Sequence, residues 1–527
     1  MPSEMKVEVL HKETIKPFLH ASTRSCGAQT AKMLAYFLLI IYFFHPGRMF
    51  KPTIGSKDVT APKANNFWPL ANGWGTLLCN SGVEQKMASD IKVEILHKET
   101  IKPSSPTSHH LKTCSLSGYD QLTPEIYVPL ILFYPNGGDE ASIDHHALFA
   151  DRFGLLKRSL SEALTHFYPF AGEFVFNVSI SCSDHGAGLI EAQVNCPISK
   201  ILDKPDFQIL GQLIPTSIDS KQAETGHLLL VQVSSFKCGG LAIGMSISHK
   251  VADASTLSAF IKSWAAMALG SAGATDHAVP SPEFGIAATL FPPQDILNSQ
   301  QGTMEFPPDK GIGKRFVFDA SKIAALKSKA ASATVPNPTR VEVVSALIWK
   351  CAMEASRSNL SFTKPSVWSQ VVNMRKRSGK TLVENILGNF LWYFAAMSTE
   401  SEVDLEILVA KFRKGIEEYK EKYPNSVGCE DALQSVKEHG NILINDSIVT
   451  YSCSSWCRFP FYETNFGWGQ PSWVSIPSSE FKNTIILMDT SDGFGVEALL
   501  TFTEEDMAII ERHEDLLAYA SVNPPVI

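Results

Sequence analysis

The 527-residue sequence predicts an α/β protein with at least two domains. From residue 91 onward, strand-like and helix-like patterns alternate along the chain, which is typical of an α/β architecture. The length exceeds the size at which one hydrophobic core keeps growing. A proline-rich stretch over about 280–308 cannot continue a helix or a central strand, so we expect it to be an exposed connector between two halves.

In the first half, the first expected element is a buried strand over 126–134, an almost unbroken apolar run. A helix is expected over 152–167, because leucines recur there at helical spacing. A second buried strand over 228–235 leads into a turn that contains Gly239 and Gly240. Glycine supplies the positive φ of a tight turn cheaply, so we expect a β-hairpin.

The second strand of this hairpin ends at a histidine. Along 241–248, large apolar residues alternate with small ones, so the small side offers room for a bulky packing partner. His249 follows directly, and Asp253 then opens a helix. A histidine at the end of a strand is held by a rigid scaffold and can still face a cavity, which is a common setting for catalytic groups.

The second half is expected to begin with a strand near Lys314. A helix over 341–354 follows a capping box made by Thr339 and Glu342. A strand near 366–372 and a single helix over 504–518 complete the expected elements.

Composition excludes several classes of protein. With 46 Lys and Arg against 54 Asp and Glu, the net charge is −8, which argues against a nucleic-acid partner. The ten cysteines are scattered without a C-x-x-C pair, and the histidine pairs lack a carboxylate or cysteine at ligand spacing, so no metal is expected. Scattered thiols in a large chain indicate a reducing compartment, and we expect the cytosol.

The amino-terminal region contains a short repeat. Residues 5–17 and 91–103 are identical at eleven of thirteen positions, at an offset of 86. We interpret 1–87 as an extra segment with a duplicated start, poorly ordered, with Met87 beginning the working protein. The apolar run 33–44 has twelve residues, whereas a membrane-spanning helix needs about twenty. Membrane attachment stays as the less favoured alternative.

The chemistry depends on two motifs. The pair His249 and Asp253 is weak evidence alone, since the first could be a core histidine and the second a helix N-cap. A turn-rich loop follows near the carboxyl end, where Asn465, Gly467, Trp468 and Gly469 stand in NFGWG. Together with 164–174, 180–194, 372–377, 387–389 and 486–500, these motifs resemble the BAHD acyltransferases, the plant acyl-CoA-dependent family with H-x-x-x-D and D-F-G-W-G signatures. The resemblance covers about 91–520 and is nearest to the vinorine synthase-like group.

The resemblance implies two chloramphenicol acetyltransferase-like domains with a central channel between them. The amino-terminal domain would cover 88–288, the crossover loop 289–312 and the carboxy-terminal domain 313–527. Acyl-CoA would enter from one face and a small-molecule acceptor from the other, with His249 midway. We expect a monomer.

The implied reaction moves an acyl group from CoA to a hydroxyl, or less favourably an amine, of a plant specialised metabolite such as an alkaloid or terpenoid. His249 would act as general base, without a covalent acyl-enzyme and without a metal or bound cofactor. The stretch ILGNF stands where malonyl-specific relatives have YFGNC, which favours acetyl-CoA. The acceptor itself is left open.

The other implied site residues have structural or substrate-binding roles. Asp253 would pair with Arg375 and fix the loop that carries His249. Thr339 and Lys314 could contact CoA, or could equally be a helix cap and a solvated charge. Asn465 replaces the aspartate of the family loop, which removes a negative charge. That change leaves a second hypothesis open, a catalytically impaired member that binds a CoA ester or a metabolite.

Overall fold

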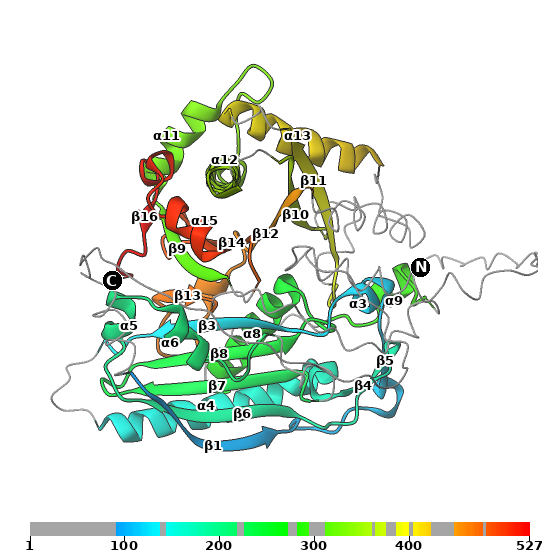
Figure 1. The fold of residues 1–527 in the computed structure, drawn as a ribbon. Coiled ribbons are helices and arrows are strands. Elements are labelled where there is room, and N and C mark those ends of the chain that lie inside the picture. Colours follow the sequence, from blue (N-terminus) through cyan, green and yellow to red (C-terminus); the bar gives the residue numbers. More distant parts are fainter. Residues whose placement is uncertain are drawn as a thin grey trace, which may run out of the picture.

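The computed structural model describes residues 91–137, 144–218, 226–271, 282–294, 311–360, 364–375, 386–399, 404–422, 447–477 and 481–526. The segment 1–87, with its apolar run, lies outside the described residues, and so does most of the crossover 289–312. Two mixed β-sheets with helices on their faces form two halves, so the predicted α/β class is confirmed (Figure 1).

The first half is built on a six-stranded sheet in the order β1-β6-β7-β8-β3-β13. Helices α4 and α8 pack on one face of this sheet, and the short helices α5 and α6 pack on the other. The bounds are β1 Val93–Ile101, β3 Tyr127–Tyr134, β6 Ala187–Val194, β7 Leu229–Phe236, β8 Leu241–Ser248, β13 Trp473–Ser475, α4 His145–His166, α5 Ser199–Asp203, α6 Phe207–Gln212 and α8 Ala254–Ser271.

The predicted hairpin is present, because β7 and β8 are antiparallel neighbours and Gly239 turns the chain with φ of +75°. The large residues of β8 face α4 and α8. Its small side is covered by the residues that follow α6: a Cβ on Gly244 would lie 1.8 Å from the Leu213 carbonyl oxygen. The sequence predicted a bulky packing partner on the small side of β8. In the structure, the backbone of the residues after α6 packs there as well as their side chains.

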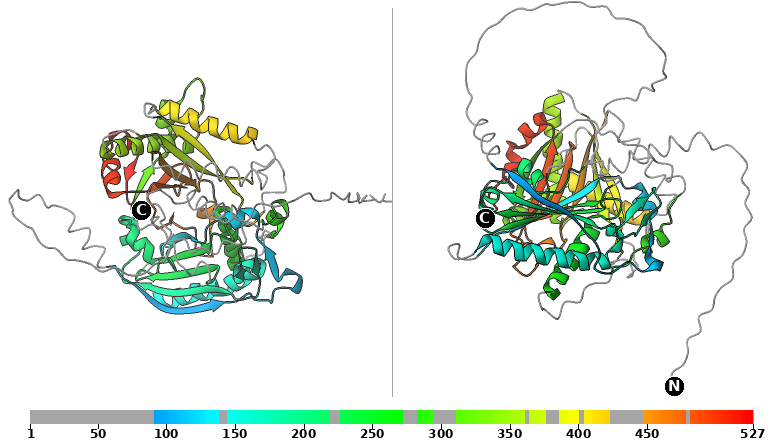
Figure 2. Two further views of the ribbon diagram at one scale, coloured as in Figure 1. Left: turned by 45° about the vertical axis from the view of Figure 1, so that its right-hand side comes forward. Right: turned by 90° about the horizontal axis from the view of Figure 1, so that it is seen from below.

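The second half has a seven-stranded sheet in the order β11-β10-β12-β14-β15-β9-β16. Helices α12 and α13 pack against this sheet, and α13 lies at the end of the molecule away from the first sheet (Figures 1 and 2). The bounds are β9 Ile312–Phe318, β10 Ser366–Asn373, β11 Leu391–Ser398, β12 Val449–Ser455, β14 Thr484–Asp489, β15 Val496–Phe502, β16 Ser521–Val522, α11 Ala320–Ala330, α12 Arg340–Leu360 and α13 Leu405–Lys422.

The carboxy-terminal part of the chain does not stay in its own half. Strand β13 pairs antiparallel with β3 of the first sheet. Trp473 stacks on Phe133 with ring centroids 5.1 Å apart, while its indole N–H donates to Glu497 of the second sheet at 3.1 Å. Ile486 and Met488 of β14 also join the core of the first half. Residue 313 therefore does not separate the two halves in space, because segments that follow it in the sequence pack into the first half.

Two expected elements differ from the structure. The region 504–518 is broken into α15 (Glu504–Ile510) and α16 (Glu514–Leu517). His513 interrupts it in an extended conformation, with its ring 2.7 Å from the Glu354 carboxylate of α12. A tertiary contact thus overrides the helical pattern, which no glycine or proline interrupts.

The described part of the proline-rich connector is also more ordered and more buried than expected. It forms the short helix α9 (Ile286–Leu290), where Ala287 is buried. Phe291 follows and packs edge-on against Tyr119 at 4.7 Å between ring centroids. The prolines bound this helix rather than prevent it.

A small third sheet and one helix lie beside the first half. The sheet has the order β2-β5-β4, and α3 begins directly after β2 (Figure 1). Within the described residues, no helix combines the length and apolarity needed to cross a membrane. The bounds are β2 Thr113–Ser115, β4 Glu173–Val175, β5 Ser179–Ser181, α3 Gly118–Leu122 and the 3₁₀ turns His109–Leu111, Tyr168–Ala171 and Phe461–Glu463.

Candidate active site

His249 stands immediately after β8, as predicted, and its side chain is deeply buried. The residue is 1% exposed, and its backbone N–H donates to the Ile126 carbonyl at 2.8 Å. Burial lowers the pKa of the imidazole, because the charged form loses its hydration. The ring is therefore neutral near pH 7, which is the state that a general base requires.

Asn389 contacts this imidazole from the second half. The His249 Nδ1 atom lies 3.0 Å from the Asn389 Oδ1 atom. The Asn389 amide nitrogen donates to the His249 carbonyl at 2.6 Å and to Asp120 Oδ1 at 2.9 Å. One side chain thus holds the ring and the backbone of the same histidine, so Asn389 is part of the site.

Asp120 lies behind Asn389, on the short helix α3. Its Oδ1 also accepts the Asn389 backbone N–H at 2.7 Å, and its Oδ2 accepts from Ser117 N and Oγ at 2.9 and 2.7 Å. Burial raises the pKa of this carboxyl, and the four donors oppose that rise. Ser117 and Asp120 form a capping box, which is why the sequence SGYD begins a helix here.

Asp253 has two roles in the structure. Its Oδ1 caps α8 by accepting the Thr256 N–H at 2.8 Å, as the helix-cap interpretation predicted. Its Oδ2 accepts from Arg375 Nη1 at 2.7 Å, and the two side chains are 0% and 3% exposed. The ion pair implied by the family resemblance is therefore present together with the cap.

Arg375 extends this contact to the segment 386–390. Its Nε donates to the Ile386 carbonyl at 2.9 Å, and its Nη2 donates to the Gly388 carbonyl at 3.0 Å. Asp253 Oδ2 also accepts the Phe390 backbone N–H at 3.1 Å. The buried ion pair thus fixes the backbone on both sides of Asn389.

Lys250, the neighbour of His249, is a buried cation that the sequence analysis did not single out. Its Nζ donates to the Gln121 carbonyl at 2.9 Å and to Asn177 Oδ1 at 2.8 Å. Burial lowers its pKa from 10.5 to about 8. These contacts tie the chain after β8 to α3 and to the turn between β4 and β5.

The NFGWG loop is shaped by Asn465. Its Oδ1 accepts the backbone N–H groups of Gly467 at 2.8 Å and Gly469 at 3.1 Å. Both glycines have positive φ, at +112° and +105°. A carbonyl oxygen makes these two contacts as well as a carboxylate would, so the loop keeps its turn without the family's negative charge.

Aromatic packing fixes the other side of this loop. Phe466 is buried against Trp264 of α8, with ring centroids 4.9 Å apart. Trp468 packs edge-on against Tyr134 at 6.1 Å, and the Arg152 guanidinium lies 5.4 Å from the centre of its ring. The loop therefore packs on the first half, although its sequence belongs to the second.

The two expected CoA contacts differ in their surroundings. Thr339 forms the predicted capping box: its N–H donates to the Glu342 carboxylate at 2.7 Å, and its hydroxyl accepts the Glu342 N–H at 3.2 Å. Lys314 lies at a cleft, 3.0 Å from Glu511. Its neighbour Arg315 is buried against Glu497, with Nε 2.7 Å from Oε2.

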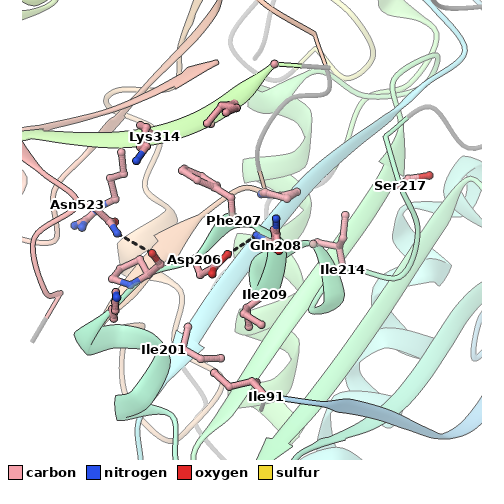
Figure 3. Close-up of a pocket in the computed structure, with 18 of the residues that line it drawn as sticks. Ile91, Ile201, Asp206, Phe207, Gln208, Ile209, Ile214, Ser217, Lys314 and Asn523 are labelled. Atoms are coloured by element: carbon pink, nitrogen blue, oxygen red, sulfur yellow. Dashed lines mark hydrogen bonds between the residues drawn. The ribbon is translucent and has the colours of Figure 1, made fainter. Parts of the chain in front are cut away.

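This cleft of about 640 Å³ lies between the two halves (Figure 3). Residues of α5 and α6 line one side and β9 lines the other, and Figure 3 shows Lys314 across the cleft from Asp206. Ile218 is one of its lining residues, and the Ile218 carbonyl accepts the N–H of Tyr127. The preceding residue, Ile126, accepts the His249 N–H. Two backbone hydrogen bonds therefore connect the lining of the cleft to the histidine, but His249 is not among the lining residues.

Over the part of the chain that the structure describes, no group of three or more His, Cys, Asp or Glu side chains could hold a metal ion. The Asn389 amide contacts His249, and the carboxylates of Asp120 and Asp253 bind Asn389 and Arg375. The arrangement can hold one neutral imidazole in a fixed orientation, and such an imidazole can take a proton from an acceptor group.

Known proteins identify the family. The sequence model of the Transferase family matches residues 91–517. The epi-neemfruitin B 7-O-acetyltransferase of Melia azedarach is 36% identical over 452 residues, which cover 82% of this chain and 99% of that protein. The chain belongs to the BAHD acyltransferases. Another relative, the 17,18-epoxy-17-hydroxycur-19-ene N-malonyltransferase of Strychnos nux-vomica, is 35% identical over 440 residues, which cover 83% of this chain and 92% of that protein.

The crystal structure of vinorine synthase confirms the BAHD fold. It aligns with a TM-score of 0.72 and 32% identity, covering 83% of this chain and 100% of that one. The expected two-domain architecture and the acyltransferase class are therefore confirmed.

Besides Lys250, sequence analysis missed Asn389 and Asp120. Asn389 stood in the family-like segment 387–389, but nothing in the sequence gave it a partner. Asp120 stands in the Ser-x-x-Asp spacing of a capping box, which predicts the start of a helix. That spacing does not predict the contact of Asp120 with Asn389, 269 residues away.

Proposed function

We propose that this acyltransferase moves an acetyl group from acetyl-CoA to a hydroxyl of a plant specialised metabolite such as an alkaloid or terpenoid, with His249 as the general base. The observation that carries the proposal is the held imidazole: His249 has its Nδ1 against Asn389 Oδ1 and a pKa lowered by burial. In this proposal, His249 Nε2 is the atom that takes the proton from the acceptor hydroxyl.

The proposed step needs no acyl-enzyme. His249 Nε2 takes the proton of the acceptor hydroxyl while the oxygen attacks the thioester carbonyl carbon. The new C–O bond forms a tetrahedral intermediate, the C–S bond breaks, and the imidazolium returns its proton to the CoA thiolate. Base assistance of this kind contributes about 10² to 10⁴ in rate. All atoms and charges balance between the two substrates and one histidine, so no bound cofactor enters the proposal.

The choice of acyl group and acceptor rests on two arguments. The Melia relative is an O-acetyltransferase, and ILGNF stands in this chain in place of the malonyl-type YFGNC. The Strychnos relative is an N-malonyltransferase, so an amine acceptor with a malonyl donor is the second candidate.

Asn465 was the reason to consider a catalytically impaired binding protein. In the structure its carbonyl oxygen accepts two backbone N–H groups, and both bonds are ones that an aspartate would also accept. The contacts of Asn465 that the structure describes require an acceptor rather than a charge. This geometry supports an active enzyme over the impaired alternative.

For the CoA phosphates we propose Lys314 rather than Thr339. In the capping box, the Thr339 N–H already donates to the Glu342 carboxylate and its hydroxyl already accepts the Glu342 N–H. Lys314 instead lines the cleft together with Lys200 and Lys204. We also propose a monomer in the cytosol, where the seven described cysteines would remain the free thiols that the structure shows.

The proposal is tested by mass spectrometry of products from acetyl-CoA or malonyl-CoA and a panel of plant alcohols and amines. We expect an acetylated alcohol whose formation falls at least 100-fold in His249→Ala. Lys314→Ala should raise the KM for acetyl-CoA with little change in kcat, whereas Lys329→Ala, on an exposed helix, should change neither. Undiminished product in His249→Ala would remove this residue from the mechanism.

A further inference from the structure

The two faces of the second sheet belong to different cores. In β14, Ile485 and Leu487 are part of the core of the second half. Ile486 and Met488 are part of the core of the first half. Because side chains alternate between the two faces of a strand, Thr484 lies on the same face as Ile486. The Thr484 side chain therefore faces the first half.

Hydroxyl side chains continue this face across two neighbouring strands. Strands β14, β12 and β10 are adjacent in the second sheet (Figure 1). Thr484 is paired with Ser452 of β12, and Ser452 is paired with Ser369 of β10. Thr450 precedes Ser452 by two residues and so lies on the same face. Adjacent strands are about 4.8 Å apart, so these four residues form one hydroxyl cluster.

Three hydroxyls of this cluster are buried without a hydrogen bond. Ser369 Oγ, Thr450 Oγ1 and Thr484 Oγ1 have no hydrogen-bond partner among the described residues. The three residues are 1%, 0% and 2% exposed, respectively. A buried hydroxyl without a partner lowers stability, and native proteins retain few of them. The cluster therefore offers hydrogen bonds that a polar ligand can take up.

The hydroxyl cluster is linked to the interface that holds His249. Phe481 stands three residues before Thr484. It forms one apolar cluster with Ile126 and Ile218 of the first half. The Ile126 carbonyl accepts the His249 backbone N–H at 2.8 Å. The start of β14 is thus connected to the histidine through one apolar cluster and one hydrogen bond.

Another hydroxyl without a partner belongs to the residue directly before the histidine. Ser248 is 0% exposed, and no described residue makes a hydrogen bond to its Oγ. Ile247 faces the core that contains α4 and α8, so Ser248 faces the opposite side of the sheet, where α5 and α6 line the cleft. His249 itself is 1% exposed. An acceptor that reaches the imidazole therefore enters a region as covered as the hydroxyls.

We propose that Ser369, Thr450 and Thr484 determine acceptor specificity by binding a second oxygen of the acceptor, a hydroxyl or carbonyl away from the group that is acylated. A hydroxyl side chain can donate to a carbonyl oxygen and can also accept from an alcohol. The acceptor class is then a metabolite with several oxygens rather than a hydrocarbon with one hydroxyl. This inference rests on the proposed function and narrows its acceptor class.

The position of the cluster favours the acceptor over CoA. Lys314, which we propose for the CoA phosphates, is on β9, and β15 lies between β9 and β14. The hydroxyl cluster extends from β14 to β10, away from β9. The amides of the pantetheine arm of CoA offer similar hydrogen bonds, so the experiment must distinguish the two substrates.

Thermal unfolding without substrate tests whether the hydroxyls are available to a ligand. The combined variant Ser369→Ala, Thr450→Val and Thr484→Val replaces each hydroxyl by an apolar group of similar shape. Because no described hydrogen bond is lost, we expect an unchanged or higher unfolding midpoint. A midpoint clearly below that of the native enzyme would show that the hydroxyls serve the folded structure, and would overturn the proposal.

Ser366→Ala is the matched control for this measurement. Ser366 is on the same strand as Ser369 and is also 1% exposed. Its Oγ accepts the Trp349 indole N–H at 3.0 Å. The variant leaves that buried donor unsatisfied, so we expect a lower midpoint. Ser366 lies on the opposite face of β10, so the control should keep the native acceptor preference.

Competition between matched acceptors tests the specificity itself. The probes are a saturated steroid with one hydroxyl on its first ring and the same steroid with an added hydroxyl or ketone on its last ring. With acetyl-CoA, we expect the native enzyme to prefer the doubly oxygenated steroids at least about tenfold in kcat/KM. We expect the combined variant to reduce this preference below about threefold, as measured by mass spectrometry of the mixed products.

Two results of the competition would overturn the proposal. One is an unchanged preference in the combined variant. The other is a raised KM for acetyl-CoA with an unchanged preference, which would assign the hydroxyls to the pantetheine arm. The unfolding midpoints do not depend on acyl transfer, so failure of the proposed function is distinguishable from failure of this inference.

Discussion

Two loops of the molecule carry the family motifs. One is stabilised by a buried ion pair, and the other by neutral hydrogen bonds and aromatic packing. The histidine loop, 249–253, is buried and is held by a charge pair between Asp253 and Arg375, whose side chains are 0% and 3% exposed. The NFGWG loop, 465–469, lies partly at the surface and is held by the neutral side chain of Asn465 and by aromatic packing.

The difference explains why the two aspartates of the family signatures are not equivalent. In the histidine loop, loss of the charge would leave a buried guanidinium without its partner. In the NFGWG loop, each contact of residue 465 requires only an acceptor oxygen, which asparagine supplies. This chain keeps the aspartate in the first position and replaces it in the second.

The largest expected effect comes from Asp253→Asn. We expect a loss of about 3 to 5 kcal/mol in the free energy of unfolding, because the Arg375 charge stays buried without compensation. Denaturant unfolding measures it. Asp319→Asn is the matched control, since Asp319 caps α11 in the same way but is paired with Ser321 and no arginine. Equal losses in the two variants would show that the cap, and not the ion pair, holds the histidine loop.

A smaller effect is expected from Gly469→Ala. A Cβ at this position meets nothing within 4 Å, so the cost reports only the backbone conformation at φ of +105°. We expect about 1 to 2 kcal/mol of destabilisation. Gly270→Ala also enters open space, but in helix α8, and should be neutral or stabilising. A neutral result for Gly469→Ala would mean that the loop relaxes freely and does not depend on its turn.

The smallest effects are expected at residue 465. Asn465→Asp should change stability by less than about 0.5 kcal/mol and kcat by less than about threefold, because both hydrogen bonds persist. Asn465→Ala should cost about 0.5 to 1 kcal/mol, since water replaces a partly exposed acceptor. Thermal unfolding and initial rates measure both. A large gain of activity in Asn465→Asp would instead support the impaired alternative.

Local patterns predicted the elements that carry the motifs. The hairpin before His249, the helix after Asp253 and the capping box at Thr339 each depend on residues within a few positions of one another, and all three are present. The family resemblance added the pair of Asp253 and Arg375, which are 122 residues apart.

The remaining features depend on contacts that no local pattern contains. Asn389 contacts His249 although the two residues are 140 positions apart in the sequence. Nothing in the residues around Asn389 distinguishes it from an asparagine at the surface. The three residues of β13 are too few to show an alternation, yet they join the first sheet. His513 divides an otherwise helical pattern through its contact with Glu354. In each case tertiary packing decides the outcome.

The central claim is that a neutral His249 takes the proton of the acceptor, and the pH dependence of kcat/KM tests it most directly. Burial is the main reason that the pKa of the imidazole is lowered from 6.5, and Asp253 and Lys250 are the charged groups that act on the ring in opposite directions. Protonation removes the base, so kcat/KM should fall as pH decreases through that lowered pKa and be constant near pH 7. The account predicts an inflection below pH 6.5 that is absent from the residual activity of His249→Ala. The same inflection in that variant, or none in the native enzyme, would contradict it.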